Sequence, residues 1–277
     1  MSWHAQLQLD YQPQAGGRTA LKHSHTGPLR ILKSLYPEGE AICHNVIVHP
    51  PGGLVGGDEL DIRVRVDEGA HALVSTPGAT RFYASDALQA SQRVSIDLAA
   101  NARLEWLPLE TLAYPGCQAL NELRFTLAPG AELLAWDVTA LGLPSAHQAF
   151  SHGRFQQRLE MPGLWMEQAR LDATDHRLLN SPLGLDGQRC LGSLLLATGH
   201  AMGRERREGL LDATRLALRS APDDVRWGVT CVNPQMLVVR AVAPLVEPLM
   251  ASLQAAWAAL RHTAWGLVPT APRIWRV

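Results

Sequence analysis

Three carboxylates lie next to tryptophans in this sequence, at Glu105-Trp106, Trp136-Asp137 and Trp165-Met166-Glu167. Carboxylates that face an interior channel attract cations and replace part of their hydration shell. A pair of carboxylates on either side of a sugar could instead supply the acid and the base of glycoside hydrolysis. The simplest interpretation is alternation, in which each tryptophan packs into the core and its neighbouring carboxylate points to water. These residues are therefore candidates for ion passage or for acid-base chemistry.

Potential metal ligands form a second group, Cys43, His44 and His49. Thiolate and imidazole suit nickel, copper or zinc. In a strand, however, residues 43 and 44 point to opposite faces, and residues 44 and 49 differ by an odd number. The three side chains can share one metal site only if the strand contains a bulge.

A glycine-rich segment follows, in which Gly52, Gly53, Gly56 and Gly57 precede Asp58. A phosphate-binding loop needs Gly-x-x-x-x-Gly-Lys-Ser/Thr at the start of a helix, and Asp58 stands where a cation or hydroxyl is required. The glycines favour a strained turn with close backbone packing, in which the carboxylate of Asp58 accepts backbone N–H groups. The sequence has no Gly-x-Ser-x-Gly motif, and the adjacent Cys43-His44 pair is not a catalytic dyad, so no catalytic centre is predicted.

Composition limits the possible partners. The 277 residues include 25 Lys+Arg and 26 Asp+Glu, and 47% of them are apolar. This chain can bury a large core but has no basic field for nucleic acid. No apolar run is long enough to span a membrane, and the N-terminal sequence lacks the features of a secretory signal. The four cysteines match no metal or disulfide pattern, so we expect reduced thiols and a cytoplasmic protein.

Five segments repeat a pattern of strand, tight turn and strand, 29 to 33 residues apart. Apolar and polar residues alternate along the strands, as in a sheet with one buried face. Each turn has a residue that tolerates positive φ. The five turn residues are Gly39, Gly69, Asn101, Gly130 and Gly163. The pattern predicts a mainly β fold, a solenoid-like (β-helical) stack of strand-turn-strand repeats, with a β-sandwich as the alternative.

Helix signals are weak before residue 243, and the charged run Arg204–Glu208 is interpreted as a solvated turn. A C-terminal amphipathic helix is predicted around residues 244–262, because Leu249, Leu253 and Leu260 share one face with other apolar residues. After it we expect an extended tail. No Pro/Ser-rich linker interrupts the chain, which favours one domain over residues 1–277.

Several motifs occur together in a fixed order. They are His49-Pro50-Pro51-Gly52-Gly53-Leu54-Val55-Gly56-Gly57-Asp58, Thr76-Pro77-Gly78-Ala79-Thr80-Arg81-Phe82-Tyr83, Glu105-Trp106-Leu107-Pro108, Trp136-Asp137 and Pro272-Arg273-Ile274-Trp275. In this respect the chain resembles the urease accessory protein UreD family, also called UreH, over nearly its whole length. It departs from the family pattern at Leu109, Leu143 and His147-Gln148, so the family match assigns no role to residues at these positions.

The resemblance implies a non-enzymatic, β-rich scaffold without a permanently bound cofactor. Such a scaffold docks on apo-urease, recruits UreF and through it the GTPase UreG, and assists delivery of a transient nickel ion. Within the matched motifs, Gly52, Gly53, Gly56, Gly57, Pro77, Gly78, Trp106 and Pro108 are then structural residues. Family members are thought to carry a polar internal passage for the metal. The candidates for lining or gating it are Asp58, Glu105, Asp137, Glu167, Cys43, His44 and His49.

Two alternatives stay open at this point. Arg273 and Trp275 either contribute to a partner interface, since both residue types are enriched in binding hot spots, or close the end of the solenoid. The alternative function is a β-solenoid carbohydrate-active enzyme that uses paired carboxylates. Such an enzyme needs aromatic platforms along a groove, whereas a scaffold exposes an apolar patch that its partners cover.

Overall fold

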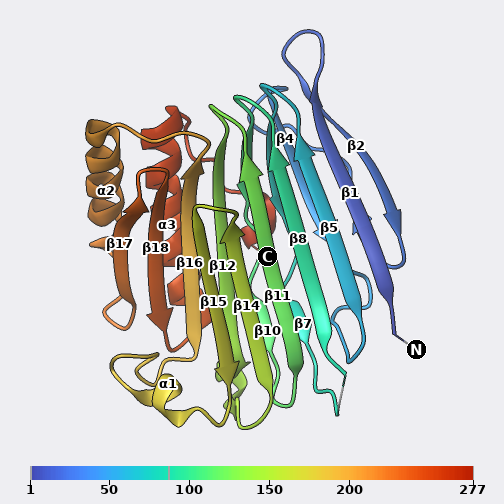
Figure 1. The fold of residues 1–277 in the computed structure, drawn as a ribbon, viewed down its shortest axis with the longest axis vertical. Helices are drawn as coiled ribbons and strands as arrows, with labels where there is room; N and C mark the ends of the chain where they lie inside the picture. The colour runs from blue at the N-terminus through green and yellow to red at the C-terminus, as the bar shows by residue number, and fades with distance from the viewer. Residues whose placement is uncertain (1, 87, 277) are drawn as a thin grey trace.

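The computed structural model describes residues 2–86 and 88–276 and is mainly β, with two sheets packed face to face (Figure 1). The seven-stranded front sheet has the order β15-β14-β11-β8-β5-β1-β2. Its strands are β1 (His4–Pro13), β2 (Thr19–Thr26), β5 (Glu59–Val66), β8 (Ala90–Leu98), β11 (Gln118–Leu127), β14 (Arg154–Met161) and β15 (Trp165–Asp172).

The back sheet follows the order β17-β18-β16-β12-β9-β6-β4-β3, and three short strands attach beside it. Its strands are β3 (Arg30–Ile31), β4 (Ile42–Val48), β6 (His71–Ser75), β9 (Arg103–Trp106), β12 (Glu132–Leu143), β16 (Cys190–Thr198), β17 (Arg226–Asn233) and β18 (Met236–Ala243). The attached strands are β7 (Thr80–Phe82), β10 (Thr111–Ala113) and β13 (Gln148–Ala149).

The predicted solenoid is confirmed in the middle of the chain. From β4 to β14 the chain alternates between the sheets, and neighbouring strands of each sheet run parallel, giving about four turns. Gly69, Asn101 and Gly130 pass the chain from the front to the back sheet with φ of 74°, 56° and 78°. All three residues adopt the left-handed conformation that the repeat requires.

The two outer copies of the repeat differ from the middle three. Gly163 joins β14 to β15 in an antiparallel hairpin within the front sheet, so the chain turns back instead of crossing between sheets. Gly39 lies in the loop before β4, and Leu35 on the far side of this loop forms a single bridge with His44 of β4. After β15 the chain adds the antiparallel strands β16, β18 and β17 to the back sheet.

The turn at Asn101 gives a direct test of this conformation. Asn101→Val should lower the free energy of unfolding by roughly 1–2 kcal/mol, because a β-branched residue clashes with its own backbone at positive φ. Asn101→Gly keeps the turn and should change that free energy by less than about 0.5 kcal/mol. Urea unfolding of both variants measures the difference, and equal losses would show that the backbone conformation at this turn is not what matters.

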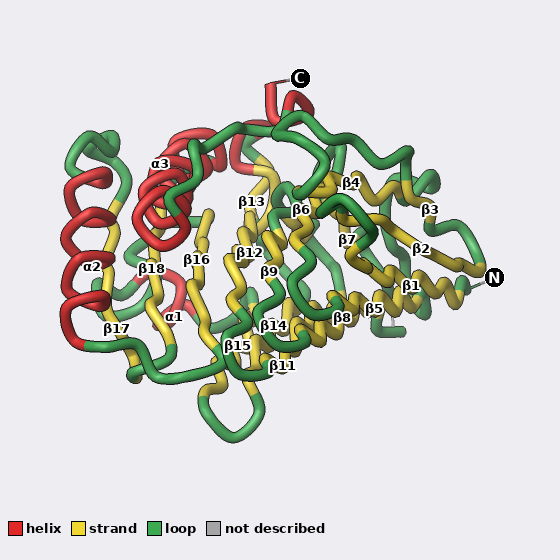
Figure 2. Tube along the Cα trace, turned by 90° about the horizontal axis from the view of Figure 1, so that it is seen from above, coloured by secondary structure: helices red, strands yellow, loops and turns green. Residues whose placement is uncertain are grey.

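Apolar side chains form two layers, one between the two sheets and one between the back sheet and the helices. Figure 2 shows these sheets and helices from above. One cluster fills the space between the sheets, with Leu7, Ile62 and Phe125 from the front sheet and Leu104 and Leu133 from the back sheet. The second cluster lies on the outer face of the back sheet, under α2 and α3. The middle strands of the back sheet are therefore buried on both faces, and α3 packs on β12, β16 and β18.

The helices are α1 (His176–Asn180), α2 (Arg204–Leu218) and α3 (Val246–Trp265), with 3-10 turns at Pro144–Ala146 and Arg273–Arg276. α3 confirms the predicted C-terminal helix and ends at Gly266, whose φ is 67°. The expectation of a turn at Arg204–Glu208 was wrong, because this run opens α2. The prediction of an extended tail was also wrong at Arg273–Arg276, which forms a 3-10 turn. Within the described residues, no helix combines the length and the apolar character needed to cross a membrane.

Candidate functional site

A row of amide side chains crosses the inner face of the front sheet. Gln92, Asn121 and Gln157 lie on β8, β11 and β14, and the parallel register places the three side by side. Residues paired in register point to the same face, so these amides lie in a space otherwise filled by apolar side chains. Gln92 Nε2 donates to Asn121 Oδ1 at 3.2 Å, which connects the first two.

Asp137 faces this row from β12 of the back sheet. Its Oδ2 accepts from Asn121 Nδ2 at 2.7 Å, and its Oδ1 accepts from Gln157 Nε2 at 2.6 Å. Thr139 Oγ1 donates to Oδ1 at 3.4 Å. A buried carboxylate needs such donors, since an unpaired one would be strongly penalised. Among the residues that the structure describes, neutral side chains alone hold this carboxylate by hydrogen bonds.

The surroundings of Asp137 change its acidity. Burial raises the pKa of Asp137 from 3.8 to about 6, while the hydrogen bonds from Gln157, Thr139 and Asn121 act in the opposite direction. The nearby carboxylate of Glu167 raises that pKa further. A group with a pKa near 6 exchanges protons close to neutral pH, and an arriving cation favours its ionised form.

Three cavities follow one another along the row. The first, of about 220 Å³, is bounded by His49, Gly52, Gly53, Arg81 and the Thr76–Thr80 loop. A constriction of about 20 Å³ shares Gln92 and Trp106 with it and also contacts Asn121 and Asp137. The second cavity, of about 450 Å³, is lined by Asp137, Gln157, Glu167, Ser193 and Arg240 among others. The shared residues place these three cavities next to one another along the amide row, which we call the polar line, and the smallest has room for about one water molecule.

His49 lies at the first cavity. Its Nε2 is buried and has no hydrogen-bond partner among the described residues. Burial lowers the pKa of His49, although the carboxylate of Asp58 raises it. A neutral imidazole with a free ring nitrogen is a suitable ligand for nickel, copper or zinc.

The glycine-rich segment builds the wall of the first cavity. A Cβ on Gly53 would lie 2.3 Å from Tyr83 Cε2 and 3.0 Å from the Arg81 carbonyl oxygen, so only glycine fits there. Gly57 has a φ of 88°. Asp58 is not among the described residues that line this cavity. Its carboxylate accepts from the backbone N–H groups of Trp3 and Val55 at 2.8 and 2.9 Å, the turn-holding role considered from the sequence.

Glu105 and Asp137 point to opposite faces of the back sheet. Glu105 is fully buried on the outer face, beneath α3. It accepts from Trp257 Nε1 at 2.7 Å and from Arg261 Nε at 3.1 Å, and contacts His71 Nε2 at 3.1 Å. The structure therefore separates Glu105 from the polar row, to which Asp137 and Glu167 both contribute cavity-lining side chains.

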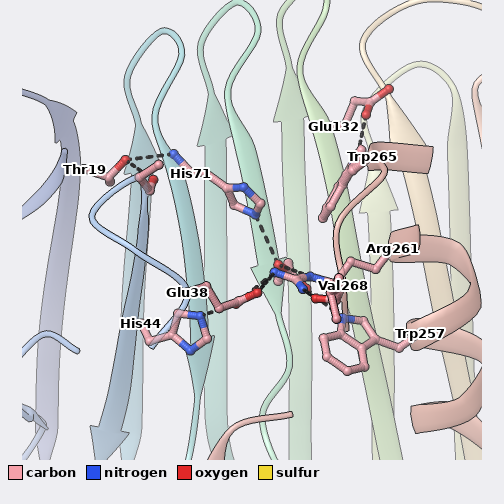
Figure 3. A network of polar contacts seen from close by, with 11 residues as sticks. Thr19, Glu38, His44, His71, Glu132, Trp257, Arg261, Trp265 and Val268 are labelled. Carbon is pink, nitrogen blue, oxygen red and sulfur yellow. Dashed lines mark hydrogen bonds and ion pairs between the residues drawn. The ribbon is translucent and has the colours of Figure 1, made fainter. Parts of the chain in front are cut away.

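The network around Glu105 continues to His44 (Figure 3). Arg261 also donates to Glu38 at 2.9 Å, and Glu38 contacts His44 Nε2 at 2.7 Å. Burial acts to raise the pKa of Glu38, but the hydrogen bonds from His44 and Arg261 outweigh it and hold that pKa below its usual range. His44 therefore belongs to this network on the outer face of the back sheet and does not share a site with Cys43.

Cys43 points inward from β4, where its thiol donates to Asn45 Oδ1 at 3.3 Å and burial raises its pKa. Cys43, His44 and His49 therefore have three separate environments. Among the described residues, three potential metal ligands come within reach of one another only at His4, Glu59 and Asp61, an exposed or half-buried group outside the cavities. Along the polar line, His49 lies at the first cavity and the carboxylates of Asp137 and Glu167 lie at the second.

Comparison with known proteins identifies the family. Residues 4–276 match the profile of the family described as UreD urease accessory protein. The chain is 56% identical over 275 residues to the urease accessory protein UreD of Albidiferax ferrireducens, with 99% of each chain covered. The chain belongs to the UreD family.

Other UreD proteins agree over the same length. The identity to the urease accessory protein UreD of Paracidovorax citrulli is 57% over 275 residues, 99% of each chain. With that of Leptothrix cholodnii it is 50% over 277 residues, 100% of each chain. The resemblance predicted from the ordered motifs is thereby confirmed.

The C-terminal UreD motif covers the outer face of the back sheet. Trp275 Nε1 donates to Ser75 Oγ at 3.0 Å, and the ring lies 4.9 Å from Trp136 and 5.2 Å from Trp257 between centroids. Arg273 is exposed and borders an adjacent groove of about 780 Å³. Trp275 thus packs against this face, whereas Arg273 lies exposed at its edge.

Sequence reasoning about this UreD chain missed the amides and Arg240. A signal was present, since Gln92 and Asn121 each lie nine residues before their repeat turns, Asn101 and Gly130. Each also occupies an inward position in an otherwise apolar alternation, which the pairing of the two residues and the hydrogen bond between them confirm. A polar residue that recurs at one inward position of a repeat predicts a polar row through the core.

Proposed function

We propose that this chain is a urease maturation scaffold that docks on apo-urease, recruits UreF and through it the GTPase UreG, and assists nickel delivery by conducting the ion along the polar line between its sheets. The observation that carries this proposal is the row of Gln92, Asn121 and Gln157 facing Asp137. Apolar side chains at these four positions would make the core more stable. Its retention between two cavities favours a role in transport.

The side chains along the line match the chemistry of a borderline divalent cation. Imidazole, amide oxygen and carboxylate are all suitable donors, and each is offered by a fixed residue. The constriction of about 20 Å³ is too small for a hydrated ion, so nickel must exchange water for these donors there. Asp137 can release its proton as the cation arrives and take one up after the cation leaves, because its pKa lies near 6.

Exposed apolar side chains support docking of partners. Leu183 is 97% exposed and Met166 is 57% exposed, and both are sequence neighbours of residues that line the second cavity. Leu32 and Leu35 are half exposed at the groove that Arg273 borders. Large apolar side chains in such positions are typical of interaction surfaces.

The carbohydrate-enzyme alternative loses its support. Glu105 and Asp137 lie on opposite faces of a sheet and cannot flank one glycosidic bond. Asp137 and Glu167 do share a cavity, but its described lining contains no aromatic side chain on which a sugar could stack. The scaffold therefore explains the cavity linings better.

Co-expression tests the proposal. The chain is produced with apo-urease subunits, UreF and UreG, each with a different tag, followed by affinity capture, size-exclusion chromatography and nickel-dependent urease assays. We expect co-elution with apo-urease and UreF, and urease activity only when this chain is present. A chain that elutes alone beside folded partners, or activation that does not need it, would refute the proposal.

A further inference from the structure

The second cavity has an ion pair at its edge. Asp137, Ser193 and Arg240 are paired in register across β12, β16 and β18 of the back sheet, so their side chains share the inner face. At about 4.8 Å per strand, the Cα atoms of Arg240 and Asp137 lie roughly 10 Å apart. Glu167 approaches from β15, the edge strand of the front sheet, and its carboxylate accepts from the Arg240 guanidinium.

The pair spans the opening between the two sheets. Exposure increases outward, since Asp137 is buried, the Glu167 side chain is 23% exposed and the Arg240 side chain is 53% exposed. Both partners line the same cavity as Asp137. A guanidinium at this position closes the gap between the sheets and places a positive charge at the mouth of a cavity that ends in a carboxylate.

This charge acts on what can enter. A fixed cation within about 10 Å lowers the local concentration of another cation roughly 2- to 20-fold, depending on the local dielectric. Arg240 also neutralises Glu167, the carboxylate that would otherwise attract a cation to the mouth. An anionic group that binds Arg240 would remove both obstacles at once.

We propose that the Arg240–Glu167 ion pair is a gate that excludes cations from the second cavity. The gate opens when an acidic side chain of a docked partner binds Arg240 and thereby breaks its ion pair with Glu167. Exposed Met166 beside Glu167 and Leu183 beside the cavity loop give such a partner apolar contacts next to the arginine. The purpose of this gate rests on the proposed nickel passage, but its existence can be measured without urease.

The test measures access to a cysteine inside the cavity. Cys231, the half-buried thiol, is replaced by serine, and Ser193→Cys places a thiol between Asp137 and Arg240; the other cysteines are buried. The purified full chain reacts with cationic trimethylammonium-ethyl, anionic sulfonatoethyl and neutral methyl methanethiosulfonate. Mass spectrometry gives the rate of modification at position 193 for each reagent.

Arg240→Gln should raise the ratio of cationic to neutral rates about 2- to 20-fold, the range expected from removing one nearby positive charge. Arg240→Gln with Glu167→Gln should give a smaller rise, because the attracting carboxylate is absent too. Arg226→Gln is the matched control, since Arg226 pairs with Asp186 near the same sheet edge and is not among the described residues that line the cavity. It should leave the ratio unchanged.

Three results would overturn the gate. The ratio could be unaffected by Arg240→Gln, it could rise equally with Arg226→Gln, or the neutral reagent could fail to reach position 193 in every variant. Failure of the gate and failure of the nickel passage are distinguishable. A gated cavity in a chain that still activates urease without the Asp137 carboxylate would keep the gate and remove the passage.

Discussion

Asp137→Asn is expected to make the protein more stable at pH 7 and unable to support nickel-dependent urease activation. The two effects have one cause, since the substitution removes a charge that the fold buries at a cost. A residue placed for packing would show the opposite relation, with stability and function lost together. Retention of a destabilising group is typical of functional sites.

The stability effect follows from the raised pKa. The pKa of Asp137 rises from 3.8 to about 6 on folding, so between these values the folded protein binds more protons than the unfolded chain. Stability must then fall as pH rises through this window, and the full cost is present above it. The difference corresponds to roughly 3 kcal/mol. Because the asparagine must re-form hydrogen bonds with Asn121 and Gln157, we expect a net gain of about 1–3 kcal/mol at pH 7.

Urea unfolding at pH 4.5 and pH 7.5 measures this effect. The stabilisation by Asp137→Asn should be large at the higher pH and small at the lower one, where the wild-type carboxyl is already protonated. Asp97→Asn is a matched control, because Asp97 is exposed on the outer face of the front sheet. It should alter neither stability nor urease activation by a comparable amount. A destabilised Asp137→Asn protein at pH 7.5, or one with normal activation, contradicts the prediction.

The middle of the fold follows from rules that act within single repeats. Turn residues with positive φ and strands of alternating polarity are local features, so Gly69, Asn101 and Gly130 could be recognised from the sequence. The ends of the solenoid could not. Gly163 also has a positive φ. The strands on either side of it, β14 and β15, nevertheless pair with each other in the front sheet, and the parallel strands of that sheet end at β14. α2 was missed because its buried residues, Leu210, Thr214 and Leu218, form only a narrow stripe.

Glu105 and Asp137 show what the spacing of residues within the repeat can predict. Glu105 lies four residues after Asn101, and Asp137 lies seven residues after Gly130. An odd difference places them on opposite faces of equivalent strands, so their separation was implicit in the repeat. The partners of Glu105 were not, since Trp257 and Arg261 belong to a helix more than 150 residues away. Only the packing of α3 brings them together.

Arg261→Met is expected to cause the largest loss of stability of any substitution considered, about 3–5 kcal/mol. Arg261 is fully buried and is the guanidinium that contacts both Glu105 and Glu38. Methionine replaces most of the side-chain volume but leaves two buried carboxylates without this cation. An uncompensated buried charge costs more than a lost hydrogen bond, because its desolvation is no longer offset.

Arg204→Met is the matched control, because Arg204 pairs with Glu208 on the surface of α2. Exposed pairs contribute little, so its effect should stay below about 1 kcal/mol. Urea unfolding compares the two variants. If Arg261→Met yields no soluble protein, Arg261→Lys, which keeps a cation at the same place, should recover a folded chain with intermediate stability. Equal effects of Arg261→Met and Arg204→Met would contradict the proposed energetics of the network.

The same substitution should also loosen the C-terminal segment. Arg261 donates to the carbonyl oxygen of Val268, just beyond the end of α3, and Trp257, which shares Glu105 with it, packs against Trp275. Since this network fixes the helix to the back sheet, hydrogen exchange should accelerate in residues 266–276 of a folded Arg261 variant before it changes in the solenoid turns. Uniform acceleration throughout the chain would mean that the network supports the whole fold and not specifically the layer that covers the back sheet.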